Sequence, residues 1–377
     1  MPCTPNGQRA AVRSDDMLAV APAGQDRSHG ADLGDLPLTT LIWLGFLAVV
    51  LVCLALDLGV FHREARVVRA REAFMWTGVW VTLAVLFSFA VYYAYANPHS
   101  VAGPVDLHDY APLEAVQLYF TAYLVEYSLS LDNIVVMALI FTHFCVPLSL
   151  QHRVLFWGVL GAIVMRFGFI VAGSALLSEI SWVSYVFGGL LLLSAARMLF
   201  SKEGEFAPEK NIWVRGLRRM LPVHDDFEGS SFFTRRDGRM HATRLFIVLL
   251  LVEGSDLIFA VDSIPAALAI TSDPFLVFTS NIFAVMGLRS LYFALAPLIE
   301  RFRYLKISLV FLLGFVGAKL LLHDYVEIDP TTTLMVIGAT ILFGVLASLF
   351  RGGGAPEQVR PPTGANPLPA DSDQHPR

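Results

Sequence analysis

Long apolar runs separated by short polar segments dominate the pattern along this chain. Runs of about 18 or more residues recur, and a helix of that length crosses about 30 Å of hydrocarbon. They lack the strict alternation of barrel strands, and a helix satisfies its own backbone hydrogen bonds in lipid. The pattern predicts an all-α polytopic bundle of about nine transmembrane helices, near residues 38–60, 73–96, 113–141, 152–177, 182–200, 243–270, 275–298, 306–323 and 331–350.

The composition agrees with a membrane protein, since 55% of the residues are hydrophobic and 16% are charged, against about 25% charged in soluble domains. Residues 1–36 form a polar tail, and the apolar run from Leu41 is too long and starts too late for a cleaved signal. Residues 37–350 form the predicted transmembrane domain, with its longest connection at 201–242. The tail at 351–377 is rich in Pro, Gly and Asp, and we predict that it is disordered.

Positive charges in the connections predict the orientation of the chain. Lys and Arg concentrate at 63–71, 201–242 and 301–306, each after an odd-numbered helix. The connection at 97–112 has neither residue, and the one at 323–330 is acidic. Because cytoplasmic loops carry excess Lys and Arg, the N-terminus is expected outside, with the C-terminus and the basic 201–242 loop in the cytoplasm.

Two acidic clusters lie within the apolar runs, one from Glu126 to Asn133 and the other from Glu253 to Pro265. A carboxylate at mid-bilayer costs about 2.5–3.5 kcal/mol on insertion scales. Such residues therefore indicate a site for a cation or a proton. The carboxylates concerned are Glu126, Asp132, Glu253, Asp256 and Asp262.

The two clusters belong to a weak internal repeat. The corresponding positions are Glu126 and Asp256, Asp132 and Asp262, Asn133 and Ser263, and further along Arg166 and Arg289. Each unit, about 113–200 and 243–323, has three predicted helices, so the second unit must enter the membrane from the opposite side. Inverted repeats of this kind occur in secondary transporters, with the substrate site at their interface near the midplane.

The polar side chains of the clusters are hard oxygen ligands. The candidate metal ligands are Glu126, Asp132, Asn133, Asp256, Asp262 and Ser263. Oxygen sets suit Mg²⁺, Ca²⁺ and Mn²⁺ better than Cu⁺ or Zn²⁺. Because Pro265 cannot donate to the carbonyl of Val261, a helix break there is expected to turn Asp262 toward Asp256.

Structural roles compete with ion binding at several positions. Glu126 and Asp256 can form structural ion pairs with Arg166 and Arg289. Asn281 can bridge two helices instead of supporting an ion site. Glu253 lies nearer the start of its helix than the other carboxylates, which favours a supporting role for it.

At these residues the chain resembles the TerC family of bacterial membrane proteins, including its Alx branch. The resemblance covers about residues 41–350, and Ser255 stands where the family leads us to expect Thr. It rests on four segments: Glu126-Tyr-Ser-Leu-Ser-Leu-Asp132-Asn133, the segment from Glu253 to Pro265, Thr279-Ser-Asn281-Ile-Phe and Gly287-Leu-Arg289-Ser-Leu-Tyr.

The resemblance implies an inner-membrane protein of the wider LysE-like transporter group. Members are associated with tellurium resistance, with the response to alkaline pH and with export of Mn²⁺. The resemblance also implies an ion site with auxiliary ligands, and two arginines that balance the charge when the site is empty. Carried onto this chain, the ligands are Glu126, Asp132, Asp256 and Asp262, the auxiliary ligands Asn133 and Ser263, and the arginines Arg166 and Arg289.

We predict an exporter of a divalent cation, with Mn²⁺ as the expected ion, and no enzyme. No nucleophile with a neighbouring base stands out in the sequence, nor does a cofactor or nucleotide motif, so an ion gradient or the membrane potential would supply the energy. The cysteines Cys3, Cys53 and Cys145 form no Cys-x-x-Cys pair. The expected partners are the bilayer and the ion, without cofactor or nucleic acid. The alternative is a membrane scaffold or assembly factor in stress response, which binds a protein through the 201–242 loop.

Overall fold

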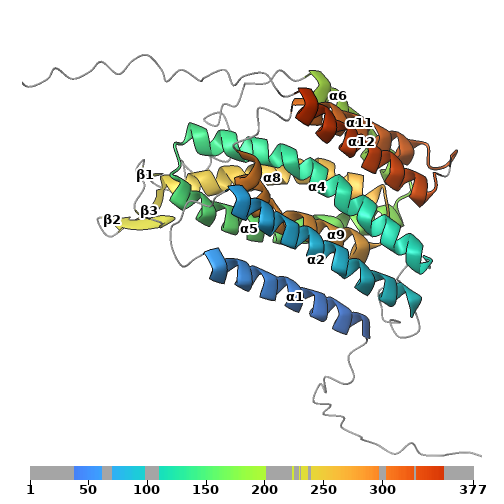
Figure 1. The fold of residues 1–377 in the computed structure, drawn as a ribbon, viewed down its shortest axis with the longest axis horizontal. Coiled ribbons are helices and arrows are strands. Elements are labelled where there is room, and N and C mark those ends of the chain that lie inside the picture. The colour runs from blue at the N-terminus through green and yellow to red at the C-terminus, as the bar shows by residue number, and fades with distance from the viewer. Residues whose placement is uncertain are drawn as a thin grey trace, which may run out of the picture.

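The computed structural model describes residues 38–61, 70–97, 110–200, 223–224, 229, 231–236, 239–296, 303–326 and 328–351. Its helices follow the predicted apolar runs (Figure 1). The predicted run at 275–298 contains both α9 and α10, which only Gly287 separates. Both predicted tails, except Arg351, lie outside the described residues. The helices are α1 (Leu38–Phe61), α2 (Ala70–Ala96), α4 (Pro112–His143), α5 (Leu148–Glu179), α6 (Val183–Phe200), α8 (Arg244–Leu268), α9 (Pro274–Met286), α10 (Leu288–Leu295), α11 (Arg303–Leu321) and α12 (Pro330–Arg351).

Six helical segments in the described part of the chain are long and apolar enough to cross a membrane. They are Arg71–Ala96, Pro112–His143, Leu148–Glu179, Val183–Phe200, Pro274–Leu295 and Pro330–Ser348. Helix α8 has 25 residues but contains Glu253, Asp256 and Asp262, which lower its hydropathy. The helical membrane architecture is thus supported, and the count of nine crossings stays a prediction.

A three-stranded sheet departs from the all-α prediction. Strands β1 (Val223–His224), β2 (Phe233–Arg236) and β3 (Arg239–Thr243) lie in the order β1-β3-β2. Strand β3 pairs antiparallel with β2 and parallel with β1. Strands of two to five residues are too short for hydropathy alternation to reveal them. Most of the predicted 201–242 loop, and with it the expected partner surface, lies outside the described residues.

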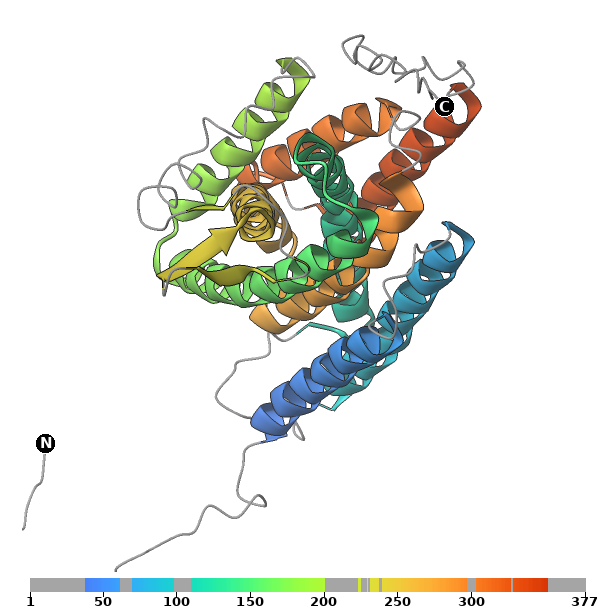
Figure 2. The same ribbon diagram turned by 90° about the vertical axis from the view of Figure 1, so that its left-hand side faces the viewer.

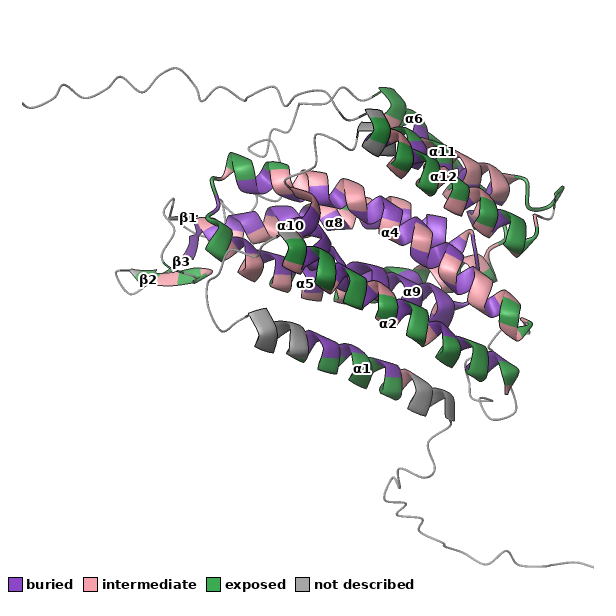
Figure 3. Ribbon diagram, in the orientation of Figure 1, coloured by how far each residue is buried: buried purple, intermediate pink, exposed green. Residues whose placement is uncertain are grey.

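The helices form a central group covered on two sides. Helix α4 packs along α9, α5 packs along α8, and α4 also crosses α8. Helices α6, α11 and α12 lie on one side, whereas α1 and α2 lie on the other (Figures 1 and 2). Buried residues concentrate on α4, α8, α9 and α10 (Figure 3), and all residues of α9 from Phe275 to Met286 are buried. The polar residues of the clusters therefore lie on the most enclosed helices.

The start of α9 is fixed by Asp273, which is buried and caps the helix. Its Oδ1 accepts hydrogen bonds from the backbone N–H groups of Phe275 (2.8 Å) and Leu276 (3.3 Å). These are two of the donors that the first turn of a helix leaves unsatisfied. The hydroxyl of Tyr95 on α2 donates to the other carboxylate oxygen. Helix α2 is thereby attached to the beginning of α9.

Helices α6 and α11 approach closely at Gly188 and Gly317. A Cβ atom on either glycine would lie 3.1 Å from the carbonyl oxygen of the other, and one on Gly188 would lie 2.7 Å from Cγ of Leu321. Small residues allow such close backbone approach between helices in membranes. The third helices of the two predicted repeat units are therefore in direct backbone contact.

Gly188→Ala is expected to destabilise the protein by about 1–3 kcal/mol, because the added methyl group overpacks this contact. The neighbouring Gly189 is exposed, with open space around it. Gly189→Ala is the matched control, and is expected to stabilise by up to about 1 kcal/mol through helix propensity. Thermal unfolding of both variants in detergent measures the difference. Equal shifts in Tm would contradict the close packing of α6 on α11.

Candidate functional site

A buried arginine, Arg166 of α5, lies at the polar centre of the bundle. Its side chain is 0% exposed. Its Nη1 forms an ion pair with Oε1 of Glu126 on α4. On Asp256 of α8, Oδ1 lies 3.0 Å from Nη2 and Oδ2 lies 3.3 Å from Nε, which is a two-pronged contact. One guanidinium thus holds two carboxylates, which explains how both are accommodated in the apolar interior.

Amide and hydroxyl groups complete this arrangement. Asn281 of α9 accepts a hydrogen bond from Arg166 Nη1 (3.1 Å) and donates one to Glu126 Oε2 (3.0 Å). Nη1 also lies 3.5 Å from Oγ of Ser263, and Asn133 donates to Oδ1 of Asp256 at 3.2 Å. Asn281 therefore bridges helices and belongs to the polar group at once. We call these six residues the central cluster: Glu126, Asn133, Arg166, Asp256, Ser263 and Asn281.

Helical spacing explains which residues meet in the central cluster. Residues seven apart are offset by only about 20° around a helix, which places Glu126 with Asn133 on α4, and Asp256 with Ser263 on α8. Arg166 Nη1 reaches both Glu126 and Ser263, whereas Asn133 reaches Asp256. This order shows that α4 and α8 run in opposite directions where they cross.

Asp262 lies outside the central cluster and contacts α6. Its Oδ1 accepts a hydrogen bond from Oγ of Ser194 at 2.6 Å, and Arg197, three residues further along α6, is near enough for its charge to attract the carboxylate. Helix α8 runs without interruption through Pro265 to Leu268. The predicted break that would turn Asp262 toward Asp256 was therefore wrong, since the helix accommodates the proline close to its end.

The other predicted site residues surround the cluster. Asp132 is half-buried and precedes Asn133, so it points about 100° away from it around α4. The half-buried Glu253 carboxylate lies against Gly161 of α5, where a Cβ atom would overlap it. Arg289 of α10 is buried, and Asp256 forms an ion pair with Arg166. Of the ion pairs expected from the sequence, those of Arg166 are present, and this one arginine serves both carboxylates.

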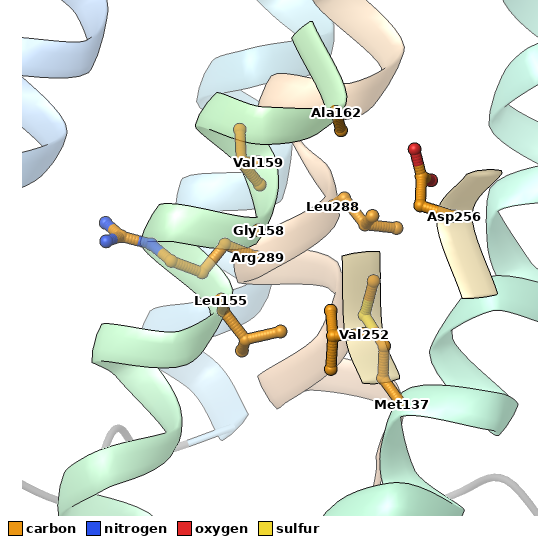
Figure 4. Close-up of a pocket in the computed structure, with 9 residues that line it drawn as sticks. All are labelled: Met137, Leu155, Gly158, Val159, Ala162, Val252, Asp256, Leu288 and Arg289. Carbon is orange, nitrogen blue, oxygen red and sulfur yellow. The ribbon is translucent and has the colours of Figure 1, made fainter. Parts of the chain in front are cut away.

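A small cavity adjoins Asp256 between α4, α5, α8 and α10 (Figure 4). Asp256 lies at one edge of it, and the guanidinium of Arg289 points away from Asp256. Most of the remaining lining is apolar, including Leu155, Val252 and Leu288. The cavity lies toward the first half of α5 and α8, which is the side predicted to face the cytoplasm.

Two buried oxygen atoms on α4 have no hydrogen-bond partner within the described part of the chain: Oγ of Ser130 and Oδ1 of Asn133. The residues are 1% and 3% exposed. A buried acceptor without a partner costs about 1–3 kcal/mol, so such atoms favour a site that a cation or water completes. Ser130 is not among the predicted ligands, although its spacing of four residues from Glu126 puts both on one face of α4.

The four predicted carboxylate ligands do not form one group in this conformation. Across the described ranges, no three Asp, Glu, His or Cys side chains gather closely enough to hold a metal ion. Glu126 and Asp256 are instead held together through Arg166. The arrangement that the residues form is therefore an acidic pair with a built-in counter-ion.

Comparison with known proteins places the chain in a family. The family model for the integral membrane protein TerC family matches residues 111–353. The chain belongs to the TerC family. Its membership confirms the resemblance seen in the acidic motifs and establishes a multi-pass integral membrane protein.

Relatives of this TerC-family chain match it over most of their length. It is 44% identical over 315 residues to an uncharacterized membrane protein of Myxococcus xanthus, covering 84% of this chain and 94% of that protein. It is 42% identical over 315 residues to Alx of Escherichia coli (strain K12), whose description proposes a membrane-bound redox modulator, covering 83% and 94%. An uncharacterized membrane protein of Rickettsia bellii is 35% identical over 309 residues, covering 82% and 97%. No solved structure matches the chain.

Proposed function

We propose that this TerC-family protein exports a divalent metal cation, with Mn²⁺ as the favoured substrate, across the bacterial inner membrane. The observation that carries the proposal is the central cluster, where two carboxylates share one guanidinium and leave a formal charge of −1. The unpaired oxygens of Ser130 and Asn133 lie on the same face of α4 as Glu126. An entering cation gains these oxygens as ligands and competes with Arg166 for Glu126 and Asp256.

In this proposal Arg166 stabilises the substrate-free state. Its guanidinium occupies the place between the carboxylates that a divalent cation takes when it binds. Glu126, Asn133, Asp256 and Ser263 offer carboxylate, amide and hydroxyl oxygens, which suit Mn²⁺, Mg²⁺ and Ca²⁺. The metal is the transported substrate here and not a resident cofactor.

Reciprocal packing of the helices supports the proposed inverted repeat. Helix α5 packs on α8 and α9 packs on α4, so the second helix of each predicted unit packs on the first helix of the other. The third helices, α6 and α11, pack on one another. We propose two opposed units, about 113–200 and 243–323, with the ion site between them.

Asp132 and Asp262 are proposed as flanking ligands of the transport path. Each precedes a cluster residue by one position, and each is half-buried. Asp262 is held by Ser194 on α6, a helix that belongs to the other proposed unit. A change in the packing of the two units therefore alters the surroundings of Asp262 directly. Glu253 and Arg289 are proposed to support the site on its cytoplasmic side. This assignment of sides assumes the predicted orientation, in which the N-terminus lies outside.

Export is tested by the manganese content of a manganese-sensitive bacterial host that expresses the chain. Wild-type protein is expected to lower the manganese content, and Glu126→Gln is expected to abolish that effect, because it removes one carboxylate from the cluster. A deletion of residues 203–222 is expected to leave export intact. This deletion stops before Val223, where β1 begins, so the sheet is kept.

Four other outcomes would redirect the proposal. A manganese content with wild-type protein no lower than that of the host without the chain would show that the chain is no manganese exporter, and equal lowering by Glu126→Gln would show that export does not need Glu126. Loss of stress resistance in the 203–222 deletion alone would favour the scaffold. A redox role like that in the description of Alx would make the phenotype depend on the cysteines. The variants Cys53→Ser and Cys145→Ser test this dependence, at one buried and one exposed cysteine respectively.

A further inference from the structure

One face of α4 carries a sulfur donor in line with the oxygen donors. Relative to Glu126, the positions of Ser130, Asn133 and Met137 are rotated by about 40°, −20° and 20°. All four side chains are buried, and Met137 is 4% exposed. A cation that enters along this face from the predicted cytoplasmic end of α4 therefore meets the thioether one turn before the amide of Asn133.

Met137 lines the same cavity as Asp256. Figure 4 shows the side chain of Met137 extending from α4 toward the other side chains that line the cavity, with Asp256 at the edge of this group. Among the residues that line this cavity, only Met137, Asp256 and Arg289 have side chains with atoms other than carbon and hydrogen. Arg289 repels cations, so Asp256 and the sulfur of Met137 are the donors that this cavity offers to a metal ion.

The second unit offers no equivalent sulfur. The face of α8 that carries Asp256 and Ser263 continues to Ala267, which is 1% exposed and corresponds to Met137 in the repeat. The thioether is therefore present on one side of the site alone. Among the residues that line the cavity, Met137 is the one that carries sulfur.

We propose that Met137 is a specificity-determining residue, which makes the site prefer Mn²⁺ and similar transition-metal ions over Mg²⁺ and Ca²⁺. A thioether is a soft ligand. Mn²⁺ prefers oxygen ligands, but as a first-row transition-metal ion it accepts one sulfur donor more readily than the harder cations Mg²⁺ and Ca²⁺ do. Mg²⁺ gives up its water reluctantly, and a sulfur atom in place of a water oxygen does not repay that loss. The inference rests on the proposed export function and names the substrate class of its site.

Met137 also packs among apolar side chains such as Leu155 and Val252. A packing role alone predicts no change in ion preference when another apolar side chain of similar volume replaces it. Met→Leu is such a change and is usually tolerated in a core. The substitution Met137→Leu therefore separates the sulfur from the packing.

The test is ion uptake by proteoliposomes that contain the full chain, with Mn²⁺, Ca²⁺ and Mg²⁺ offered singly and in competition. Met137→Leu is expected to lower the ratio of Mn²⁺ to Ca²⁺ uptake on the order of tenfold, the size of effect that loss of one partner has at a metal site. Met286→Leu is the matched control, because Met286 is also buried at 4% exposure but does not line the cavity. It is expected to leave the ratio unchanged.

An unchanged ratio in Met137→Leu, with Mn²⁺ uptake retained, would overturn the role of the sulfur while export stands. No uptake of any ion by the wild type would instead overturn the proposed function. A second sulfur-free variant, Met137→Ile, decides the case if Met137→Leu fails to fold. Retention of the wild-type ratio by folded Met137→Ile would likewise overturn the inference.

Discussion

Replacing Arg166 with methionine is expected to destabilise the folded protein by about 3–5 kcal/mol, the usual effect of removing one partner from a buried ion pair. Methionine keeps much of the apolar stem but leaves Glu126 and Asp256 without their guanidinium. The hydrogen bond from Arg166 to Asn281 is lost as well. Thermal unfolding in detergent measures the effect, as a fall in Tm relative to wild type.

Added Mn²⁺ is expected to restore part of this stability. In the export proposal the cation takes the place that the guanidinium leaves, and a ligand at 100 times its Kd stabilises by about 2.7 kcal/mol. The double variant Glu126→Gln with Arg166→Met is the control, because it has lost one of the two carboxylates and is expected to respond less. An Arg166→Met protein as stable as wild type would contradict the central cluster as described.

Asp256→Asn is expected to reduce Mn²⁺ uptake by proteoliposomes to background, a loss on the order of 100-fold. Asp256 contacts Arg166 with both carboxylate oxygens and accepts from Asn133, so its charge belongs to the centre of the site. Asp262→Asn is expected to cost about tenfold or less, because Asp262 contacts Ser194 on α6 instead. Initial uptake rates at matched protein density measure both variants.

The ranking of these two carboxylates is the informative result. Equal losses of uptake in Asp256→Asn and Asp262→Asn would show that the two carboxylates contribute equally to ion transport, as the internal repeat alone implies. Ser194→Ala is the control, since it removes the hydrogen bond to Asp262 and keeps the carboxylate. If the hydrogen bond from Ser194 positions Asp262 for transport, Ser194→Ala is expected to lower the uptake rate as much as Asp262→Asn does.

The helices were predictable from the sequence because hydrocarbon and the packed interior both favour apolar side chains, so a whole span is apolar whether it contacts lipid or, like α9, is buried. The same signal could not reveal strands as short as β2 and β3. It could not divide α9 from α10 either, since Gly287 interrupts an otherwise continuous apolar run. Local backbone geometry, not hydropathy, decides such details.

The candidate site was predictable in its residue types and less so in its geometry. The motifs drew attention to Glu126, Asp256 and Arg166, which do meet. Aligning the two repeats gave Asp132 and Asp262 the same prominence, because an alignment does not report the helix face on which a residue lies. The spacing of seven residues, from Glu126 to Asn133, carries that information. The same spacing rule finds Ser130 and Met137.

The shared arginine has an electrical consequence for transport. With one positive and two negative groups, the central cluster carries a formal charge of −1 when it is empty, and a bound divalent cation changes this to +1. In the proposed exporter, the loaded site moves outward and the empty site moves back with charges of equal size and opposite sign. Each elementary charge moved across 100 mV is worth about 2.3 kcal/mol. The work against an inside-negative potential is thus divided equally between the two halves of the cycle, and neither half bears the full charge of the ion.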